Sequence, residues 1–120
     1  TFKPIKKNAF KGNLYLLTNG GCFSMGALVP AKLKHYTNCI IIGSETGGAE
    51  RGSNAILSYT LTLPETKIRI IIPNYFLNHK VNSVQFGKGV MPHIEIVYTL
   101  NDLLTNKDLE MERVDMLLKK

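Results

Sequence analysis

The sequence predicts an α/β fold, and three features along the chain support this prediction. Two short apolar runs, residues 14–17 and 39–42, flank a segment in which apolar residues recur at helical spacing. Two further strand-like runs, residues 57–63 and 68–72, are separated by the turn sequence Pro-Glu-Thr-Lys. An amphipathic stretch closes the chain. We therefore expect a strand–helix–strand (βαβ) unit, a β-hairpin on the edge of the core and a C-terminal helix.

The first unit is predicted from residues 14–43. The run 14–17 is rich in strand formers, and the turn residues 19–21 end it. Neither this run nor residues 39–42 alternates apolar with polar residues, which is typical of parallel strands buried on both faces. A right-handed crossover would place the two strands side by side. The helix between them would bury one face, formed by Met25, Leu28, Val29, Leu33 and Tyr36.

Ser24 lies at the start of this predicted helix, just beyond the carboxyl end of the first strand. As an N-cap, its hydroxyl would accept a hydrogen bond from a free amide of the first turn. As a nucleophile, it would lie where free N–H groups and the helix dipole stabilise developing negative charge. Its position leaves both roles open. Pro30 falls inside the helical pattern and predicts a later start or a bend.

Three segments resemble signatures of the C-terminal processing (tail-specific) serine peptidases and their tricorn-core relatives. Residues 14–26, Leu-Tyr-Leu-Leu-Thr-Asn-Gly-Gly-Cys-Phe-Ser-Met-Gly, resemble the nucleophile segment of that family. Residues 42–48, Ile-Gly-Ser-Glu-Thr-Gly-Gly, resemble its strand followed by Gly-x-x-Thr-x-Gly. Residues 87–92, Gly-Lys-Gly-Val-Met-Pro, resemble its Gly-x-Gly-Ile/Val-x-Pro signature. Three matches in the right order, spread over nearly the whole chain, make the resemblance specific.

The resemblance implies a crotonase/ClpP-like partial core, a single domain over residues 1–120 and hydrolysis of peptide bonds in a polypeptide substrate. It implies that Ser24 is the nucleophile and that the Met25 backbone N–H donates to the oxyanion. Gly47 and Gly48 would bind the substrate in a glycine-rich loop whose N–H groups are free. Without the resemblance, residues 46–54 fit a plain connecting loop equally well. No cofactor or metal is expected. By the same resemblance, the protein is expected to be extracytoplasmic, in the periplasm or the cell envelope.

The sequence departs from the family pattern at the general base. Ala49 stands where tail-specific members carry a Lys, and alanine cannot take a proton. Ala27 replaces a Glu that is often found three residues after the nucleophile, and His93 replaces the usual Asp. The base is therefore left unassigned. Ala49 favours a second hypothesis, in which the chain is a degenerate, non-catalytic module that binds peptides or acts as a scaffold.

Four other titratable residues are expected to lie outside the site. We predict that His35 is solvated or caps the helix, that His79 is exposed, and that Glu50 and Arg51 form an exposed pair. In an alternative to the exposed pair, the Glu50 carboxylate would orient a histidine supplied from outside the chain. Thr105-x-x-Asp108 predicts a capping box for the last helix.

Length and composition set limits on the function. The chain of 120 residues can form one modest core, and its 44% of hydrophobic residues include no run long enough to span a membrane. The net charge of +6 comes largely from lysines near the two ends, without the aromatic and basic interleaving of a nucleic-acid site. We therefore expect no nucleic-acid partner.

The remaining expectations concern the chain's context and its cysteines. The chain begins at Thr1 and lacks the Gly-Gly stretch that helps to form the family's oxyanion hole, so we expect it to be the C-terminal part of a peptidase catalytic domain. The N-terminal part of the same protein would then be a partner. Cys22 and Cys39 lack metal-site spacing and are expected to be free, buried thiols, with a Cys22 nucleophile as a weak alternative.

Overall fold

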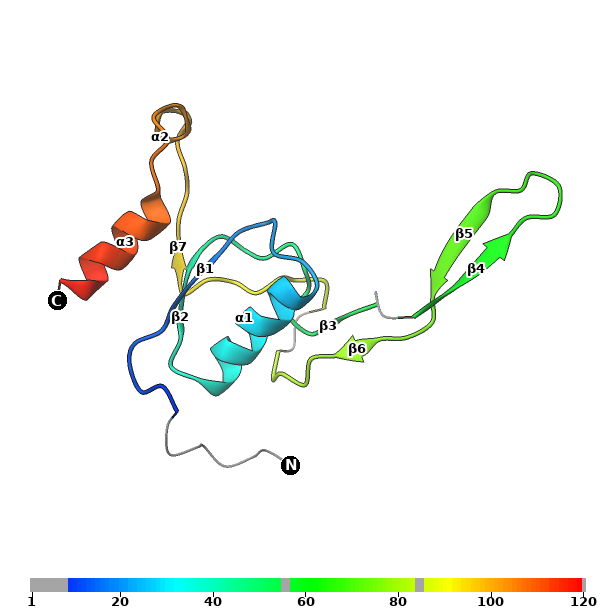
Figure 1. The fold of residues 1–120 in the computed structure, drawn as a ribbon, viewed down its shortest axis with the longest axis horizontal. Coiled ribbons are helices and arrows are strands. Elements are labelled where there is room, and N and C mark those ends of the chain that lie inside the picture. The colour runs from blue at the N-terminus through cyan, green and yellow to red at the C-terminus, as the bar shows by residue number, and fades with distance from the viewer. Residues whose placement is uncertain (1–8, 55–56, 84–85, 120) are drawn as a thin grey trace.

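Figure 1 shows the computed structural model, which describes residues 9–54, 57–83 and 86–119. The chain forms a strand–helix–strand unit, then short strands and a hairpin, and finally two helices. In order, the elements are β1 (Tyr15–Thr18), α1 (Met25–Tyr36), β2 (Ile40–Gly43), β3 (Gly52–Ser53), β4 (Ser58–Thr62), β5 (Arg69–Pro73), β6 (Leu77–Asn78), β7 (Ile94–Glu95), α2 (Leu100–Leu104) and α3 (Leu109–Leu118). The predicted α/β class, with its βαβ unit, hairpin and C-terminal helix, is confirmed.

The body of the molecule is built on a three-stranded parallel sheet in the order β1-β2-β7. In the central strand β2, Ile41 and Ile42 are fully buried, as expected for a parallel strand covered on both faces. Ile42 pairs with Ile94 of β7, which brings the chain after residue 86 alongside the βαβ unit. The edge strand β1 differs from the prediction, because Leu17 is 38% exposed and only β2 is covered on both sides.

Helix α1 packs through small residues rather than through its large apolar ones. Ala27, Pro30 and Ala31 are buried, whereas Met25 and Val29 are 59% and 46% exposed. The predicted buried face is therefore wrong at Met25, Val29 and Tyr36, whereas Leu33 packs against the core as predicted. Small side chains let the helix approach its neighbours closely and so determine which face turns inward. The helix begins at Met25 and continues through Pro30.

The core forms where α1, β2 and the segment before β7 meet. Its buried members are Ala31, Cys39, Ile41 and Val90, with Leu16, Leu33 and Val81 packed against them. Burial raises the pKa of the Cys39 thiol, which keeps it in the unreactive protonated form. Both cysteines are free as predicted, although Cys22 is only half-buried.

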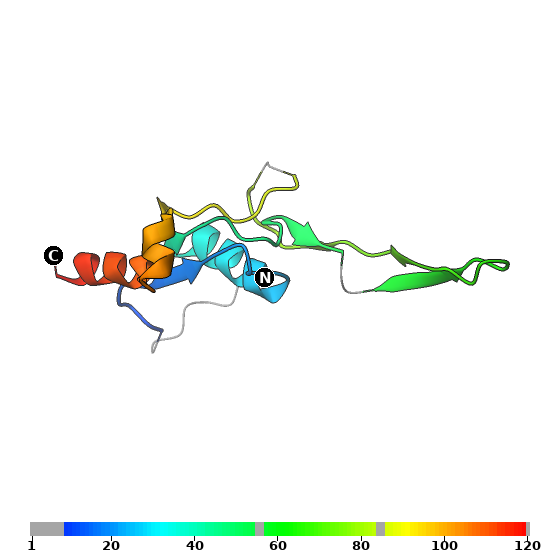
Figure 2. The same ribbon diagram turned by 90° about the horizontal axis from the view of Figure 1, so that it is seen from above.

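The hairpin of β4 and β5 projects away from this body, as Figures 1 and 2 show. Its register runs from Ser58 opposite Pro73 to Thr62 opposite Arg69, and every residue of both strands is exposed. The hairpin is confirmed, but the expected position on the core's edge with one face buried is wrong. Period-two alternation shows that a strand has an apolar face and does not show what covers it. The projection gives a radius of gyration of 18.7 Å, against about 14 Å for a compact domain of this length.

The two C-terminal helices are capped differently from the prediction. Thr99 and Asp102 form the capping box of α2, while Asp108 caps α3 by accepting the Met111 N–H at 2.9 Å. Thr105 is the C-cap of α2, so the capping box predicted at residues 105–108 is wrong. Among the described residues, no helix has the length and apolar character needed to cross a bilayer.

Candidate active site

Ser24 occupies the turn between the carboxyl end of β1 and the first residue of α1. Its backbone torsions are φ 52° and ψ −117°, a conformation that residues with a side chain rarely adopt. Such a conformation costs about 1–3 kcal/mol and persists only where the surroundings impose it. The Ser24 side chain is exposed and makes no capping hydrogen bond. The N-cap interpretation of its hydroxyl is therefore wrong.

Local hydrogen bonds fold the turn that precedes Ser24. The Asn19 side-chain oxygen accepts the Gly21 N–H at 2.9 Å, and the Asn19 main-chain oxygen accepts the Cys22 N–H at 3.0 Å. The Asn19 N–H donates to the Cys22 sulfur at 3.5 Å. An Asn side chain that accepts an amide two residues on is typical of such turns. The Cys22 thiol is therefore directed back toward Asn19.

The first amides of α1 follow directly after Ser24. The Ser24 main-chain oxygen accepts the N–H groups of Ala27 and Leu28, each at 3.0 Å. Met25 is the first helical residue, so its N–H has no acceptor within the helix, and it makes no hydrogen bond in the part of the chain that the structure describes. A free amide at a helix N-terminus, next to an exposed hydroxyl, is suited to stabilising an oxyanion.

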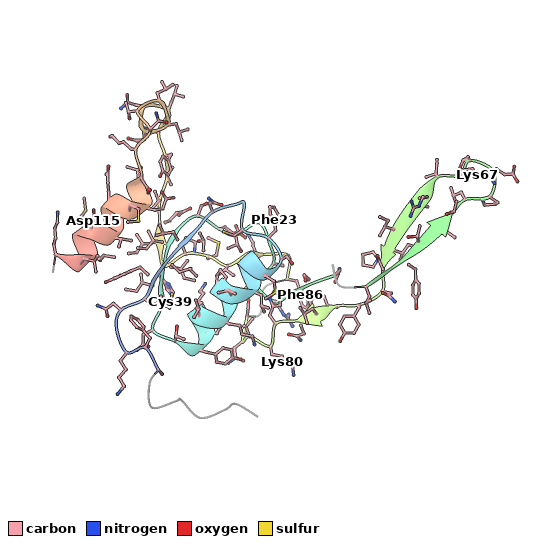
Figure 3. The ribbon with its side chains drawn as sticks, in the orientation of Figure 1. Phe23, Cys39, Lys67, Lys80, Phe86 and Asp115 are labelled. Carbon is pink, nitrogen blue, oxygen red and sulfur yellow. The ribbon has the colours of Figure 1, made fainter. Side chains whose placement is uncertain are left out.

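Gly47 and Gly48 lie against this turn, and both positions require glycine. A Cβ at position 47 would lie 2.3 Å from the Gly20 oxygen and 2.5 Å from the Phe23 ring. Figure 3 shows Phe23 beside the N-terminal end of α1. A Cβ at position 48 would lie 2.7 Å from the Cβ of Ala27. The Gly48 N–H donates to the Cys22 oxygen at 3.0 Å, which ties the glycine loop to the turn that carries Ser24. The expected free N–H at Gly48 is therefore wrong, because that donor is used within the fold.

Thr46 joins the glycine loop to the third signature segment. Its hydroxyl donates to the Gly48 oxygen at 2.8 Å and accepts the Val90 N–H at 2.8 Å. Gly89 lies so close that a Cβ there would be 1.9 Å from the Thr46 oxygen. The structure therefore brings together the three segments on which the family resemblance was based.

No basic side chain stands at the family's Lys position. Ala49 forms an isolated antiparallel bridge with Gly89 and has no group that can take a proton. Ser24 precedes the first turn of α1 and His35 lies in its last turn, so about 16 Å of helix separates the two at about 1.5 Å per residue. Of the described residues, no group of three or more His, Cys, Asp and Glu is placed to hold a metal ion.

Glu50 and His35 face each other instead of facing solvent. Glu50 is only 8% exposed, and its Oε1 lies 3.0 Å from His35 Nε2 and 3.6 Å from Lys34 Nζ. Burial raises the pKa of Glu50, but hydrogen bonds with Ser83 and His35 and the charge of Lys34 outweigh it, so the pKa lies below its usual value. The predicted exposed pair and the predicted solvated His35 are both wrong.

The two other residues predicted to be exposed are also packed. His79 is 3% exposed, and its Nδ1 lies 2.9 Å from the Glu50 main-chain oxygen. Arg51 stacks on the Phe86 ring at 3.8 Å from its centroid. His93, in place of the family's Asp, accepts the Ile41 N–H through Nδ1 at 3.0 Å and donates its own main-chain N–H to the Ile41 oxygen at 2.8 Å, which joins the segment before β7 to β2. A run of polar residues in the sequence contains no signal that distinguishes these buried contacts from solvation.

A pocket of about 550 Å³ lies at the carboxyl ends of the parallel strands. This is the edge at which open α/β sheets bind their ligands. Residues from all three strands' carboxyl ends and from the start of α3 line it: Leu17, Thr18, Asn19, Ser44, Ile96, Tyr98, Lys107, Asp108 and Glu110. Asn19 belongs both to this wall and to the turn that carries Ser24.

Comparison with known proteins agrees with this geometry. The sequence model of peptidase family S41 matches residues 2–96, which include β1, α1, β2 and the whole glycine loop. No curated protein matches the chain closely enough to count as a relative. The match covers more than half of the chain and includes all three signature segments, and we conclude that this chain belongs to peptidase family S41.

Proposed function

We propose that the chain is the C-terminal catalytic portion of a serine endopeptidase with a crotonase/ClpP-like core, in which Ser24 is the nucleophile. The backbone of Ser24 carries this proposal. A serine with a side chain that caps nothing, held at φ 52° beside the free end of a helix, gains nothing for stability from its conformation. Strained residues of this kind cluster at active sites, where they hold a reacting group in place.

In the proposed reaction, the Ser24 Oγ attacks the scissile carbonyl carbon while its proton passes to a general base. The carbonyl oxygen becomes an oxyanion, which the Met25 N–H stabilises. The intermediate then expels the amine, which takes the proton back, and water hydrolyses the acyl-enzyme in the second half of the cycle. Gly47 is exposed and would contact the substrate backbone. Gly48 would hold the loop against the turn through its hydrogen bond to the Cys22 oxygen.

The base and a second oxyanion donor would come from a part of the protein outside these 120 residues. Ala49 cannot act as a base, and Glu50 and His35 are bonded to each other near the far end of α1. A serine hydroxyl is a poor nucleophile without an adjacent base. Losing one oxyanion donor costs about a hundred- to a thousandfold in rate. We therefore expect the isolated chain to show no peptidase activity on casein, and turnover that disappears in Ser24→Ala would contradict this.

The nucleophile is tested by labelling the longer parent protein with a fluorophosphonate probe. Wild-type protein should label, Ser24→Ala should not, and Ser58→Ala, which removes a hydroxyl from the hairpin strand β4, should label like wild type. Equal labelling of wild type and Ser24→Ala would show that the assignment of Ser24 is wrong.

Ala49 supports a second candidate function, a non-catalytic module that binds or presents peptides. Neither Ala49 nor Ala27, which stand at the family's Lys and Glu positions, can take a proton, and a degenerate peptidase core would show the same losses. This candidate predicts that the parent protein binds an unstructured peptide but neither cleaves it nor labels at Ser24. Labelling at Ser24 would therefore exclude it.

A further inference from the structure

The loop that carries Gly47 and Gly48 contacts α1 at both ends of the helix. At the N-terminal end, the position of a Cβ at residue 48 lies 2.7 Å from the Cβ of Ala27. At the C-terminal end, Glu50 Oε1 lies 3.0 Å from His35 Nε2. One residue, Ala49, thus separates the contact beside Ser24 from a part-buried hydrogen bond on the last turn of the same helix.

The Glu50 carboxylate has partners from several segments of the chain. An ionised carboxylate only accepts hydrogen bonds, so His35 must donate its Nε2–H. Lys34 contributes a nearby positive charge and also donates to the Met91 oxygen at 2.9 Å, while Ser83 hydrogen-bonds the carboxylate from the segment after β6. These are the charged and titratable side chains that face the Glu50 carboxylate from the described elements packed on it.

The main chain of Glu50 is held equally firmly. Its N–H donates to the Lys88 oxygen at 2.9 Å, and its carbonyl oxygen accepts from His79 Nδ1. The carboxylate contacts add a third restraint to these two, and only Ala49 separates Glu50 from Gly48. Loss of the carboxylate contacts would therefore loosen the loop at Gly48 without releasing it completely. The Gly48 N–H, bonded to the Cys22 oxygen, reports whether the loop stays on the turn that carries Ser24.

We propose that Glu50, through its contact with His35, is a positioning residue that helps to hold the glycine loop against Ser24, and that it holds the loop more firmly when Glu50 is ionised than when it is protonated. The catalytic consequence rests on the proposed function, whereas the mechanical coupling does not. The pKa of Glu50 is lowered in the folded protein. The stabilisation is therefore complete above the ordinary carboxyl pKa and is lost as the pH falls through the lower folded value.

The coupling is tested by amide hydrogen exchange in the 120-residue chain. Glu50→Gln should lower the protection factor of the Gly48 amide by roughly ten- to a hundredfold at neutral pH, the range expected for hydrogen bonds to a charged group. The Ile40 amide of β2, bonded to the Leu14 oxygen, should change much less. Wild-type Gly48 should lose protection in acid, and Glu50→Gln should lack this pH dependence.

Two further variants keep the test decisive. His35→Gln leaves the Glu50 charge in place and should also lower protection at Gly48, by a smaller factor. Glu65→Gln, in the turn of the hairpin, should change neither amide. The proposal is overturned if protection at Gly48 stays within about twofold of wild type, or if Gly48 and Ile40 lose protection equally, which would mark general destabilisation.

Labelling of the parent protein then separates the two proposals. Both proposals are supported if Ser24 labels in wild type, if Glu50→Gln labels more slowly than wild type at pH 7, and if the two proteins label at the same rate in acid. If wild type does not label while Gly48 still responds to Glu50, the peptidase proposal fails and the positioning role stands. If wild type labels and Glu50→Gln labels at the same rate at every pH, the proposed effect of the glycine loop on Ser24 is overturned.

Discussion

Gly48 lies directly against Ser24, because a Cβ built at position 48 would be 3.2 Å from the Ser24 amide nitrogen. The two residues are far apart in the sequence and belong to different signature segments. Their contact joins the end of β1 to the loop after β2. It lies at the carboxyl ends of the parallel strands, which is the edge at which open α/β sheets bind ligands. The glycine is thus required by the close approach of the two segments, whatever else it does for a substrate.

The first prediction concerns this contact. Gly48→Ala should lower stability by about 1–3 kcal/mol, because the new methyl group would overlap Ala27 and force the loop away from the turn. It should also slow fluorophosphonate labelling of Ser24 in the parent protein. Gly20→Ala is the matched control, since nothing lies within 4 Å of its Cβ position. Similar unfolding midpoints for the two variants in urea would contradict the prediction.

The second prediction concerns the strain at Ser24. Ser24→Gly should raise stability by about 1 kcal/mol, because glycine adopts positive φ without the steric cost that serine bears there. Ser24→Ala keeps that cost and should not gain stability. Urea unfolding of the 120-residue chain measures both. The strain would be disproved if the glycine variant were no more stable than the alanine variant.

The third prediction concerns Asp102 in the capping box of α2. Hydrogen bonds from Thr99 and the Lys107 ammonium lower the pKa of Asp102 to about 2. A lowered pKa stabilises the fold above the ordinary carboxyl pKa, and this contribution is lost as the pH falls toward 2. Asp102→Asn should therefore reduce helicity at pH 7 and match wild type near pH 2 and below, as circular dichroism would show. A difference that grows in acid would contradict this.

The fourth prediction compares two isoleucines in strands. Ile41 is fully buried in β2, whereas Ile71 of β5 is 68% exposed on the projecting hairpin. Ile41→Ala should cost about 2–5 kcal/mol through lost burial and the cavity that remains. Ile71→Ala should change global stability by no more than about 0.5 kcal/mol. A large cost at Ile71 would mean that the hairpin packs on the body in solution.

The sequence was sufficient to predict the main elements and their order, but not the short strands β3 and β6 or the helix α2. Strand and helix periodicities are local properties, so the βαβ unit, the hairpin and the last helix could be predicted from spacing alone. The turn that carries Ser24 was predictable for the same reason, since Asn19 and two glycines must end β1 before the helix begins. The family resemblance rested on short contiguous segments, which remain readable without a structure.

Only the tertiary structure decided which residues are covered and which meet. Periodicity marked an apolar face on the hairpin, yet that face is exposed, and it placed Met25 and Val29 inward, yet α1 packs through smaller residues. Glu50 and His79, both predicted to be solvated, are buried because segments from distant parts of the chain supply their hydrogen-bond partners. Burial and backbone strain depend on contacts with segments that are distant in the sequence. The spacing of residues along one segment contains no information about those contacts.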